Sequence, residues 1–431
     1  MDLRLPLLLA AGLLLAGCAS PSVPLQAASS PAPTTGFDVL DTGAPCPSFC
    51  EPSVAAAPDG TVYVLSGYDL LASHDGGRTF AKGAFPPTAK GAPPGVSAND
   101  AIVQVAPDGD VYVSALLTSC LPGTVLCAAV TTEGLQVARS TDGGTTWASN
   151  VYLGLASDKG TIGADRQWLA FGKDGVVCLA YQRYGPLVVF DSELGVPSTP
   201  LNTRSPTVDS DNPVTCSTDR GATFGAFHSA LGGAIPNNEG TLIGGLPVMT
   251  PAGVLCVPHH RYDHRDLEVA CSDDGGATFR AAKVADAGDW FPMMAQRPDG
   301  SLAVAWVTPA ASGPSSLQVS ESRDAGKTWS APQRVGNASR DVGPSPWIEG
   351  TAAGWRVAWF DKAGDGTNDL WEAASETGWV PRPVQRDLGN GAQGYRTAGT
   401  DYASMASLPD GRMAIVFADL AAKTTRLAVQ R

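Results

Sequence analysis

The sequence predicts an all-β chain folded as a seven-bladed β-propeller, in which four antiparallel strands form each blade. Two recurring turns predict it, because both lie between short apolar runs of the kind that form strands. Recurrence every few tens of residues is typical of propellers and solenoids, and four strands to the repeat indicate a propeller. A six-bladed ring with an additional terminal segment is the alternative.

The first turn has the form Pro-Asp-Gly and joins strands A and B of each repeat. It is found at 58–60, 107–109, 298–300 and 409–411, and variants end at Gly175, Gly253 and Gly354. Asp-Gly between alternating apolar segments is the strongest short-range signal of a hairpin. The seven turn glycines lie 49, 66, 78, 47, 54 and 57 residues apart by subtraction, which indicates seven blades.

The second turn joins strands C and D and reads S-x-D-x-G-x-T-[WF]. Its copies are 73–80, 140–147, 217–224, 272–279 and 322–329, and 375–379 is a weaker sixth. The Asp of such a turn accepts hydrogen bonds from backbone amides ahead of it, and the Gly suits a left-handed conformation. A carboxylate satisfied in this way has a low pKa and is a poor proton donor. We therefore expect a structural role for Asp75, Asp142, Asp219, Asp274 and Asp324.

The last repeat, 401–431, ends after its third strand. The segment 37–40, Phe-Asp-Val-Leu, has the pattern of a short strand and lies at the other end of the folded region. We expect it to supply the missing fourth strand and so to close the ring between the two ends of the chain.

The S-x-D-x-G-x-T-[WF] turn resembles the Asp-box, or BNR repeat, found in sialidases and other propeller proteins. The resemblance covers essentially the whole mature chain. It implies the fold, with the turn on the outer rim and away from the central channel. Fold alone does not fix a function, so the chemistry has to be argued from other residues.

Sialidases, as a family, hold the substrate carboxylate with three arginines and use a Tyr nucleophile assisted by Glu and an Asp acid/base. Arg166, Arg261 and Arg396 are available here for such a trio, and Tyr402 for the nucleophile. The Arg-Ile-Pro motif of the family is missing. Exo-α-sialidase-like hydrolysis is therefore the alternative to a binding function, and whether the chain is a glycoside hydrolase stays open.

The N-terminus has the pattern of an export signal. Arg4 precedes a short apolar run and then Leu-Ala-Gly-Cys at 15–18. This ending resembles a bacterial lipobox, which implies cleavage before Cys18 and lipid on that cysteine; a plain signal peptide is the alternative. We expect a lipoprotein signal peptide at 1–17, a Pro-, Ser- and Ala-rich tether at 18–36 and a single propeller domain at 37–431. The protein is then a cell-envelope lipoprotein anchored to a membrane.

Eight cysteines remain after Cys18, and an even number in an exported chain suggests disulfides. Two of them follow an A–B turn glycine by three residues, and two directly precede a C–D turn, so each pair falls on neighbouring strands that can be bridged. We predict Cys178–Cys216, Cys256–Cys271, Cys46–Cys50 and Cys120–Cys127. The spacings suit no zinc site, and we expect neither a metal nor a cofactor.

The charge balance is acidic. The chain has 29 Lys and Arg against 42 Asp and Glu, a net charge of −13. This argues against nucleic acid and against electrostatic binding to anionic lipid. We expect a monomer whose membrane contact is the lipid on Cys18.

Polar residues begin several of the predicted A strands, which surround the channel of a propeller. An Asp recurs there in several repeats, and it either points into a common space or caps the strand ends. The candidates for catalysis are Asp165, Arg166, Asp289, Asp401 and Tyr402. The candidates for ligand binding are Asp100, Trp168, Trp290, Asp341, Arg261 and Arg265.

A further polar stretch, His-His-Arg-Tyr-Asp-His-Arg-Asp at 259–266, connects strands B and C of the fourth repeat. It is either a solvated loop or a ligand-contacting loop in which Arg261 or Arg265 binds a carboxylate. Metal binding is the least favoured interpretation because the spacing matches no standard site. Overall the sequence favours a lipid-anchored propeller of the cell envelope that binds glycan or protein ligands at the mouth of the channel.

Overall fold

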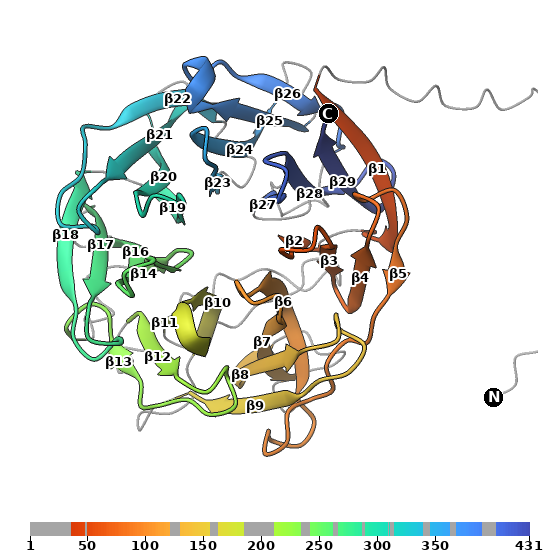
Figure 1. Cartoon of the computed structure of the whole chain (residues 1–431), viewed down its shortest axis with the longest axis vertical. Coiled ribbons are helices and arrows are strands. Elements are labelled where there is room, and N and C mark those ends of the chain that lie inside the picture. The colour runs from red at the N-terminus through yellow and green to blue at the C-terminus, as the bar shows by residue number, and fades with distance from the viewer. Residues whose placement is uncertain are drawn as a thin grey trace, which may run out of the picture. The chain divides into compact units, whose positions relative to one another are not determined.

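A computed structural model describes residues 36–47, 50–120, 130–155, 163–184, 211–233, 242–261, 266–286, 289–308, 310, 314–338, 345–362, 368–389 and 402–431. These residues form seven antiparallel sheets arranged as the blades of a ring, which confirms the predicted seven-bladed propeller (Figure 1). The helical segments among the described residues are two short 3₁₀ turns between strands, Lys173–Gly175 and Ser375–Thr377.

The first four blades follow one another along the chain, each from its innermost strand outward. Blade 1 contains β2 (Ser53–Ala56), β3 (Val62–Ser66), β4 (Asp69–Ser73) and β5 (Ala81–Lys82). Blade 2 contains β6 (Ser97–Val105), β7 (Val111–Cys120), β8 (Val130–Ser140) and β9 (Ser149–Gly154). Blade 3 contains β10 (Gly163–Phe171), β11 (Val177–Tyr184), β12 (Pro213–Ser217) and β13 (His228–Ser229). Blade 4 contains β14 (Leu242–Gly244), β15 (Val248–Met249), β16 (Leu255–Arg261), β17 (Asp266–Ser272) and β18 (Arg280–Ala285).

The remaining three blades complete the ring. Blade 5 contains β19 (Asp289–Gln296), β20 (Leu302–Thr308), β21 (Ser315–Ser322) and β22 (Gln333–Ala338). Blade 6 contains β23 (Trp347–Gly350), β24 (Trp355–Lys362), β25 (Asn368–Ala374) and β26 (Arg382–Gln385). Blade 7 contains β27 (Ser404–Ser407), β28 (Met413–Asp419) and β29 (Thr424–Gln430), with β1 (Phe37–Pro45) as its outermost strand.

The ring is closed by the two ends of the folded chain, as predicted. β1 pairs with β29 in a register that places Phe37 opposite Gln430 and Leu40 opposite Leu427. The backbone N–H of Arg431 donates to the carbonyl of Gly36 at 3.0 Å. A ring closed by hydrogen-bonded strands has no free edge at the junction of its ends, and Figure 1 shows β1 lying along β29 there.

The C–D turns hold their aspartates by a repeated set of hydrogen bonds. In the first, the Thr79 hydroxyl donates to Asp75 Oδ2 at 2.6 Å and the Thr79 amide to Asp75 Oδ1 at 2.9 Å, while Ser73 Oγ donates to Asp75 Oδ1 at 2.8 Å. Such bonds stabilise the ionised form. They hold the pKa of Asp75 and Asp274 well below the usual range and lower that of Asp142, Asp219 and Asp324 to about 2.

In the five full copies of the C–D turn, a glycine lies against the preceding blade. A Cβ on Gly77 would meet Leu427 Cδ2 at 2.5 Å, and one on Gly326 would meet Cys271 Sγ at 2.5 Å. Both glycines also have positive φ, 89° and 76°, which side chains rarely adopt. The full series of contacts is Gly77 on blade 7, Gly144 on Leu70 of blade 1, Gly221 on Tyr112 of blade 2, Gly276 on Cys216 of blade 3 and Gly326 on blade 4. The turn motif therefore joins neighbouring blades as well as closing a hairpin.

Three of the predicted disulfides are present, two of them predicted from the repeat. Cys178 lies opposite Cys216 in the β11–β12 ladder, and Cys256 opposite Cys271 in the β16–β17 ladder, and both pairs are bridged. Cys46–Cys50 forms the third. The predicted Cys120–Cys127 pair lies outside the residues whose side chains the structure describes. Disulfides persist in oxidising compartments, which supports an exported protein.

Candidate functional site

The two ends of the ring differ in what they expose. The A–B and C–D turns lie together at one end, which we call the turn face: Arg220 of a C–D turn forms an ion pair at 2.8 Å with Asp108 of the A–B turn in the preceding blade. The innermost strands begin at the other end, where the B–C connections also lie; we call it the loop face. There the Tyr68 hydroxyl, between β3 and β4, donates to the carbonyl of Ala98 near the start of β6 at 2.7 Å.

β-Bulges interrupt three innermost strands as they enter from the loop face. The pairing register shifts between Asn99 and Ile102 in β6, between Asp165 and Trp168 in β10, and between Asp289 and Met293 in β19. A bulge turns side chains away from the alternation of a regular strand and is common beside functional sites. Asp100 and Arg166 occupy the first two bulges with positive φ, 46° and 57°, a conformation that costs a non-glycine residue about 1 kcal/mol or more.

Counted back from the A–B turn glycine, the residues at one equivalent position of the innermost strands are of different kinds. Asp100, Arg166 and Tyr402 each lie nine residues before the glycine of their A–B turn (109 − 100, 175 − 166 and 411 − 402), as does Glu51 (60 − 51). Asp165 lies one residue earlier, so its equivalent in blade 2 is Asn99. The position is therefore chemically mixed, because each blade contributes a different group.

Arg166, at this position in blade 3, connects its own blade with blades 1 and 7. Its Nη1 lies 3.1 Å from Glu51 Oε1 in blade 1, and its Nε lies 3.6 Å from Asp165 Oδ2. The guanidinium carbon is 5.9 Å from the ring centroid of Trp168 and 5.8 Å from that of Tyr402 in blade 7. Arg166 is only 7% exposed, so its charge is neutralised inside the protein rather than offered to solvent. It is the sole arginine in the innermost strands that the structure describes.

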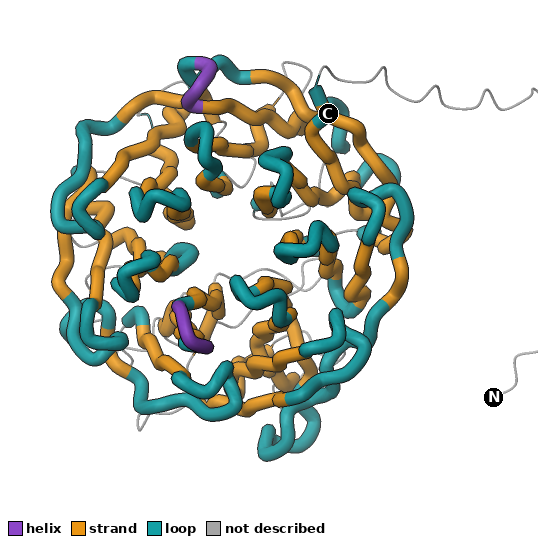
Figure 2. The backbone as a smooth tube through the Cα atoms, in the orientation of Figure 1, coloured by secondary structure: helices purple, strands orange, loops and turns teal. Residues whose placement is uncertain are grey.

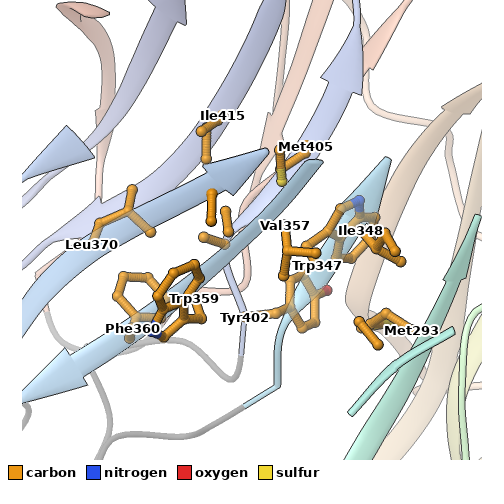
Figure 3. Packing of buried hydrophobic residues seen from close by; sticks show 14 of the residues in the cluster. Met293, Trp347, Ile348, Val357, Trp359, Phe360, Leu370, Tyr402, Met405 and Ile415 are labelled. Carbon is orange, nitrogen blue, oxygen red and sulfur yellow. The ribbon is translucent and has the colours of Figure 1, made fainter. Parts of the chain in front are cut away.

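Aromatic rings from opposite sides of the ring meet beneath Arg166. The centroids of Trp168 and Trp347 are 6.5 Å apart, those of Trp168 and Tyr402 are 6.2 Å apart, and those of Trp347 and Tyr402 are 5.2 Å apart. Figure 3 shows Trp347 and Tyr402 within the buried cluster, and Figure 2 shows the strands of the blades arranged around the channel. One cluster contains residues from six blades that lie in or beside the innermost strands: Ile102, Trp168, Leu246, Met293, Trp347 and Tyr402. We call these six residues the plug.

The accessible groups around the plug are polar and acidic. Asn99 and Asp100 are exposed on blade 2, and the side chain of Asp165 keeps 25% of its surface in solvent. The backbone is held across the two blades by Gln167 Nε2, which donates to the carbonyl of Asp100. The loop face therefore presents hydrogen-bond acceptors over a rigid, apolar floor.

Glu349 lies deeper in the channel than the plug, five residues before Gly354. The indole Nε1 of Trp347 donates to Glu349 Oε1 at 3.3 Å. Although the residue keeps some exposed surface, protein surrounds its carboxyl group, and this burial raises the pKa of Glu349 to about 8 against the opposing effect of the hydrogen bond. The corresponding residues in the other blades are Ala55, Gln104, Ala170, Val248, Ala295 and Ala406.

The structure brings together some of the predicted site residues. Asp165, Arg166, Trp168 and Tyr402 meet, but Trp168 and Tyr402 are buried in the plug, 1% and 2% exposed, so they support the floor rather than reach a ligand. Arg261 ends β16 in blade 4. The side chains of Asp289 and Trp290, and all of Asp341, Arg265, Arg396 and Asp401, lie outside the described residues.

Two histidines of the polar stretch in blade 4 are buried in a strand, so the expectation of a solvated loop is wrong for them. His259 is 0% and His260 2% exposed, and both belong to β16. His259 Nε2 lies 3.4 Å from Glu268 Oε2, and burial lowers the pKa of His260 to about 3. Within the described ranges, no group of three or more His, Cys, Asp or Glu side chains is placed to hold a metal ion.

Sequence reasoning missed Trp347 and Glu349 as members of the channel. Both become visible when each innermost strand is counted back from its turn glycine, because residues with the same count occupy equivalent positions in their blades. The contact of Arg166 with blades 1 and 7 gives no such signal, since it depends on the reach of a side chain across the ring.

No family model matches the chain, and no curated protein matches it either. Solved structures are similar over most of its length. A protein of unknown function from Dyadobacter fermentans is 16% identical with a TM-score of 0.50, over 78% of this chain and 96% of that one. An α-L-arabinofuranosidase from Fusarium graminearum is 13% identical with a TM-score of 0.51, over 92% and 98%. A sialidase from Streptococcus pneumoniae is 11% identical with a TM-score of 0.51, over 87% and 82%. At these identities the likeness shows a shared propeller fold.

No helix of the described residues is long and apolar enough to cross a membrane.

Proposed function

We propose that this chain is an exported, lipid-anchored propeller of the cell envelope that binds a glycan on its loop face, over the plugged channel. The observation that carries the proposal is the pair of accessible carboxylates, Asp100 and Asp165, beside a floor made rigid by Arg166 and the plug. Sugar hydroxyls donate well to carboxylates, and a preformed floor lowers the entropy lost on binding.

The charge of the site favours a neutral glycan. Arg166 is paired with Glu51 and Asp165, so it has little positive charge to offer an anionic sugar. Asp100 and the net charge of −13 would repel one. The lipid on Cys18 and the tether at 18–36 would hold the propeller at a membrane surface, where envelope glycans are within reach.

Exo-α-sialidase-like hydrolysis is the second candidate, and one contact favours it. Glu51, Arg166 and Tyr402 lie together near the start of the channel, and the resemblance to sialidases assigns a Tyr nucleophile, a Glu and arginines to the reaction. The burial of Tyr402 and the pairing of Arg166 argue against it, because a nucleophile and a carboxylate clamp both have to reach the substrate.

A glycan array probed with the full chain in detergent tests the binding function. We expect retention of neutral glycans, and a loss of retention in the Asp100→Asn/Asp165→Asn double variant, which keeps the size of both side chains. Retention confined to sialylated glycans, or no retention of any glycan by the wild type, would overturn the proposal. A fluorogenic sialoside assay of wild type and Asp401→Asn tests the second candidate, which requires release by the wild type.

A further inference from the structure

We propose that Tyr68 is a stacking subsite for a second sugar residue of an oligosaccharide whose first residue lies over the plug. The inference rests on the glycan-binding function proposed above and extends that site from blades 2 and 3 to blade 1.

Tyr68 is unusual in its exposure. Among the described residues, the exposed large hydrophobic side chains are Tyr68, 53% exposed, and Val380, 62% exposed. Val380 follows the turn that connects β25 to β26, on the turn face. Tyr68 connects β3 to β4 on the loop face, which is the face of the acidic groups. A single exposed apolar side chain is common on protein surfaces and does not indicate a binding site by itself. The contacts that fix the Tyr68 side chain are therefore the stronger observation.

The ring of Tyr68 is fixed at two points. Its hydroxyl donates to the carbonyl of Ala98 at 2.7 Å, and its ring packs edge-to-face on Phe85, with centroids 5.0 Å apart and planes at 86°. A surface tyrosine in a random orientation would have neither contact. Because the side chain is already ordered, stacking a ligand on it costs little conformational entropy.

A continuous line of contacts connects Tyr68 to the floor of the site. Ala98, which accepts from Tyr68, lies two residues before Asp100 in β6, about 7 Å along a strand. The carbonyl of Asp100 accepts from Gln167, the neighbour of Arg166 in β10. Asn99 and Asp100, which are both exposed, directly follow Ala98 in β6.

These residues can contact both the apolar C–H face and the hydroxyl groups of a sugar ring. The C–H face of a sugar ring is apolar and packs on an aromatic face, while its hydroxyls bond to the polar groups around it. Tyr68 supplies the first kind of contact and Asn99 and Asp100 supply the second. Lys82, an exposed cation on β5 of the same blade, forms an ion pair with Asp69, which again favours a neutral ligand over an anionic one.

The test is calorimetric titration of the full chain in detergent with neutral arabinan, xylan and glucan fragments of one to four sugar units. We expect the wild type to bind the longer fragments more tightly than the single sugar. Tyr68→Leu, which keeps an apolar side chain and removes the ring, should lose about tenfold in affinity for fragments of two or more units and nothing for the single sugar. Tyr68→Phe should fall between the two, because it keeps the ring and loses the bond to Ala98. Val380→Ala is the matched control on the turn face and should bind as the wild type does.

The possible results distinguish a failure of the Tyr68 subsite from a failure of the glycan-binding function. If the wild type binds fragments but Tyr68→Leu binds them equally well, the subsite is wrong and the glycan-binding function stands. If no fragment binds the wild type and none is retained on the array, both fail. A self-association of the wild type that Tyr68→Leu abolishes, seen by light scattering, would assign the exposed ring to a dimer contact and overturn the subsite.

Discussion

Arg166 of blade 3 and Glu51 of blade 1 form an ion pair at 3.1 Å, although blade 2 separates their strands along the chain. Both side chains are nearly buried, 6% and 7% exposed. The pair spans the start of the channel and fixes the floor on which the proposed ligand lies. Its two members are also the groups that a sialidase-like reading would assign to chemistry, so their behaviour on mutation separates a structural role from a catalytic one.

Breaking this pair should destabilise the fold strongly. Arg166→Met leaves the Glu51 carboxylate buried without its partner, which costs about 3–5 kcal/mol of the free energy of unfolding. In the double variant Glu51→Gln/Arg166→Met no charge is left unpaired between these two positions, so we expect most of the loss to be recovered. Urea unfolding of wild type, both single variants and the double variant measures this. Additive losses in the double variant would show that the two groups do not interact.

The C–D turn glycines should differ in tolerance according to what they contact. Gly326 and Gly275 both have φ of 76°, but a Cβ on Gly326 meets Cys271 Sγ at 2.5 Å and one on Gly275 has nothing within 4 Å. Alanine at either position costs about 1 kcal/mol for the backbone conformation. Gly326→Ala should cost about 1–3 kcal/mol more, because it forces blades 4 and 5 apart. Equal losses in chemical denaturation would remove the packing role of this turn between blades.

Glu349 should make the stability of the protein depend on pH near neutrality. Burial raises its pKa from 4.5 to about 8 in the folded protein, so the folded state holds the proton more tightly than the unfolded state. The contribution of Glu349 to stability is then full below the unfolded pKa and is lost as the pH rises from about 4.5 through about 8. Glu349→Gln should flatten this part of the profile. Unfolding free energies of wild type and variant across pH 4–9 measure it, and parallel profiles would contradict the assignment.

The two disulfides between strands B and C should contribute unequally. Cys178–Cys216 joins residues 38 apart and Cys256–Cys271 residues 15 apart. If each acts by limiting the unfolded chain, removing the first with paired alanines costs about 0.8 kcal/mol more than removing the second. Thermal unfolding of the two double variants under identical conditions checks this. A larger loss from Cys256→Ala/Cys271→Ala would show that packing, for example of Gly326 on Cys271, outweighs loop length.

The parts of the fold that local chemistry determines could be predicted from the sequence. Asp-Gly and S-x-D-x-G-x-T turns specify hairpins from a few consecutive residues, and their repetition gave the blade count, the closing strand and the pairing of Cys178 with Cys216 and of Cys256 with Cys271. The cysteine pairs depend only on how strands B and C of one blade are aligned. The closing strand follows from the strand that is missing in the last repeat.

The candidate site depends on packing across the ring, which no local pattern records. Asp100 of β6 and Asp165 of β10 do not occupy equivalent positions, because Asp100 aligns with Arg166 and Asp165 with Asn99 when each strand is counted back from its turn glycine. Trp168 and Tyr402 were expected at an open mouth, but they meet Trp347 from blade 6 and fill the channel. Strand ends are similarly uncertain from sequence, which is why His259 and His260 were expected in a loop.

The most direct test of the central claim is one titration and one assay on the same preparation of the full chain at pH 7. The account predicts saturable calorimetric binding of a neutral oligosaccharide that Asp100→Asn/Asp165→Asn abolishes, together with no release of fluorophore from a sialoside. Release of the fluorophore by the wild type, lost in Tyr402→Phe, with no binding of any neutral oligosaccharide, would contradict it and identify the channel as a catalytic site.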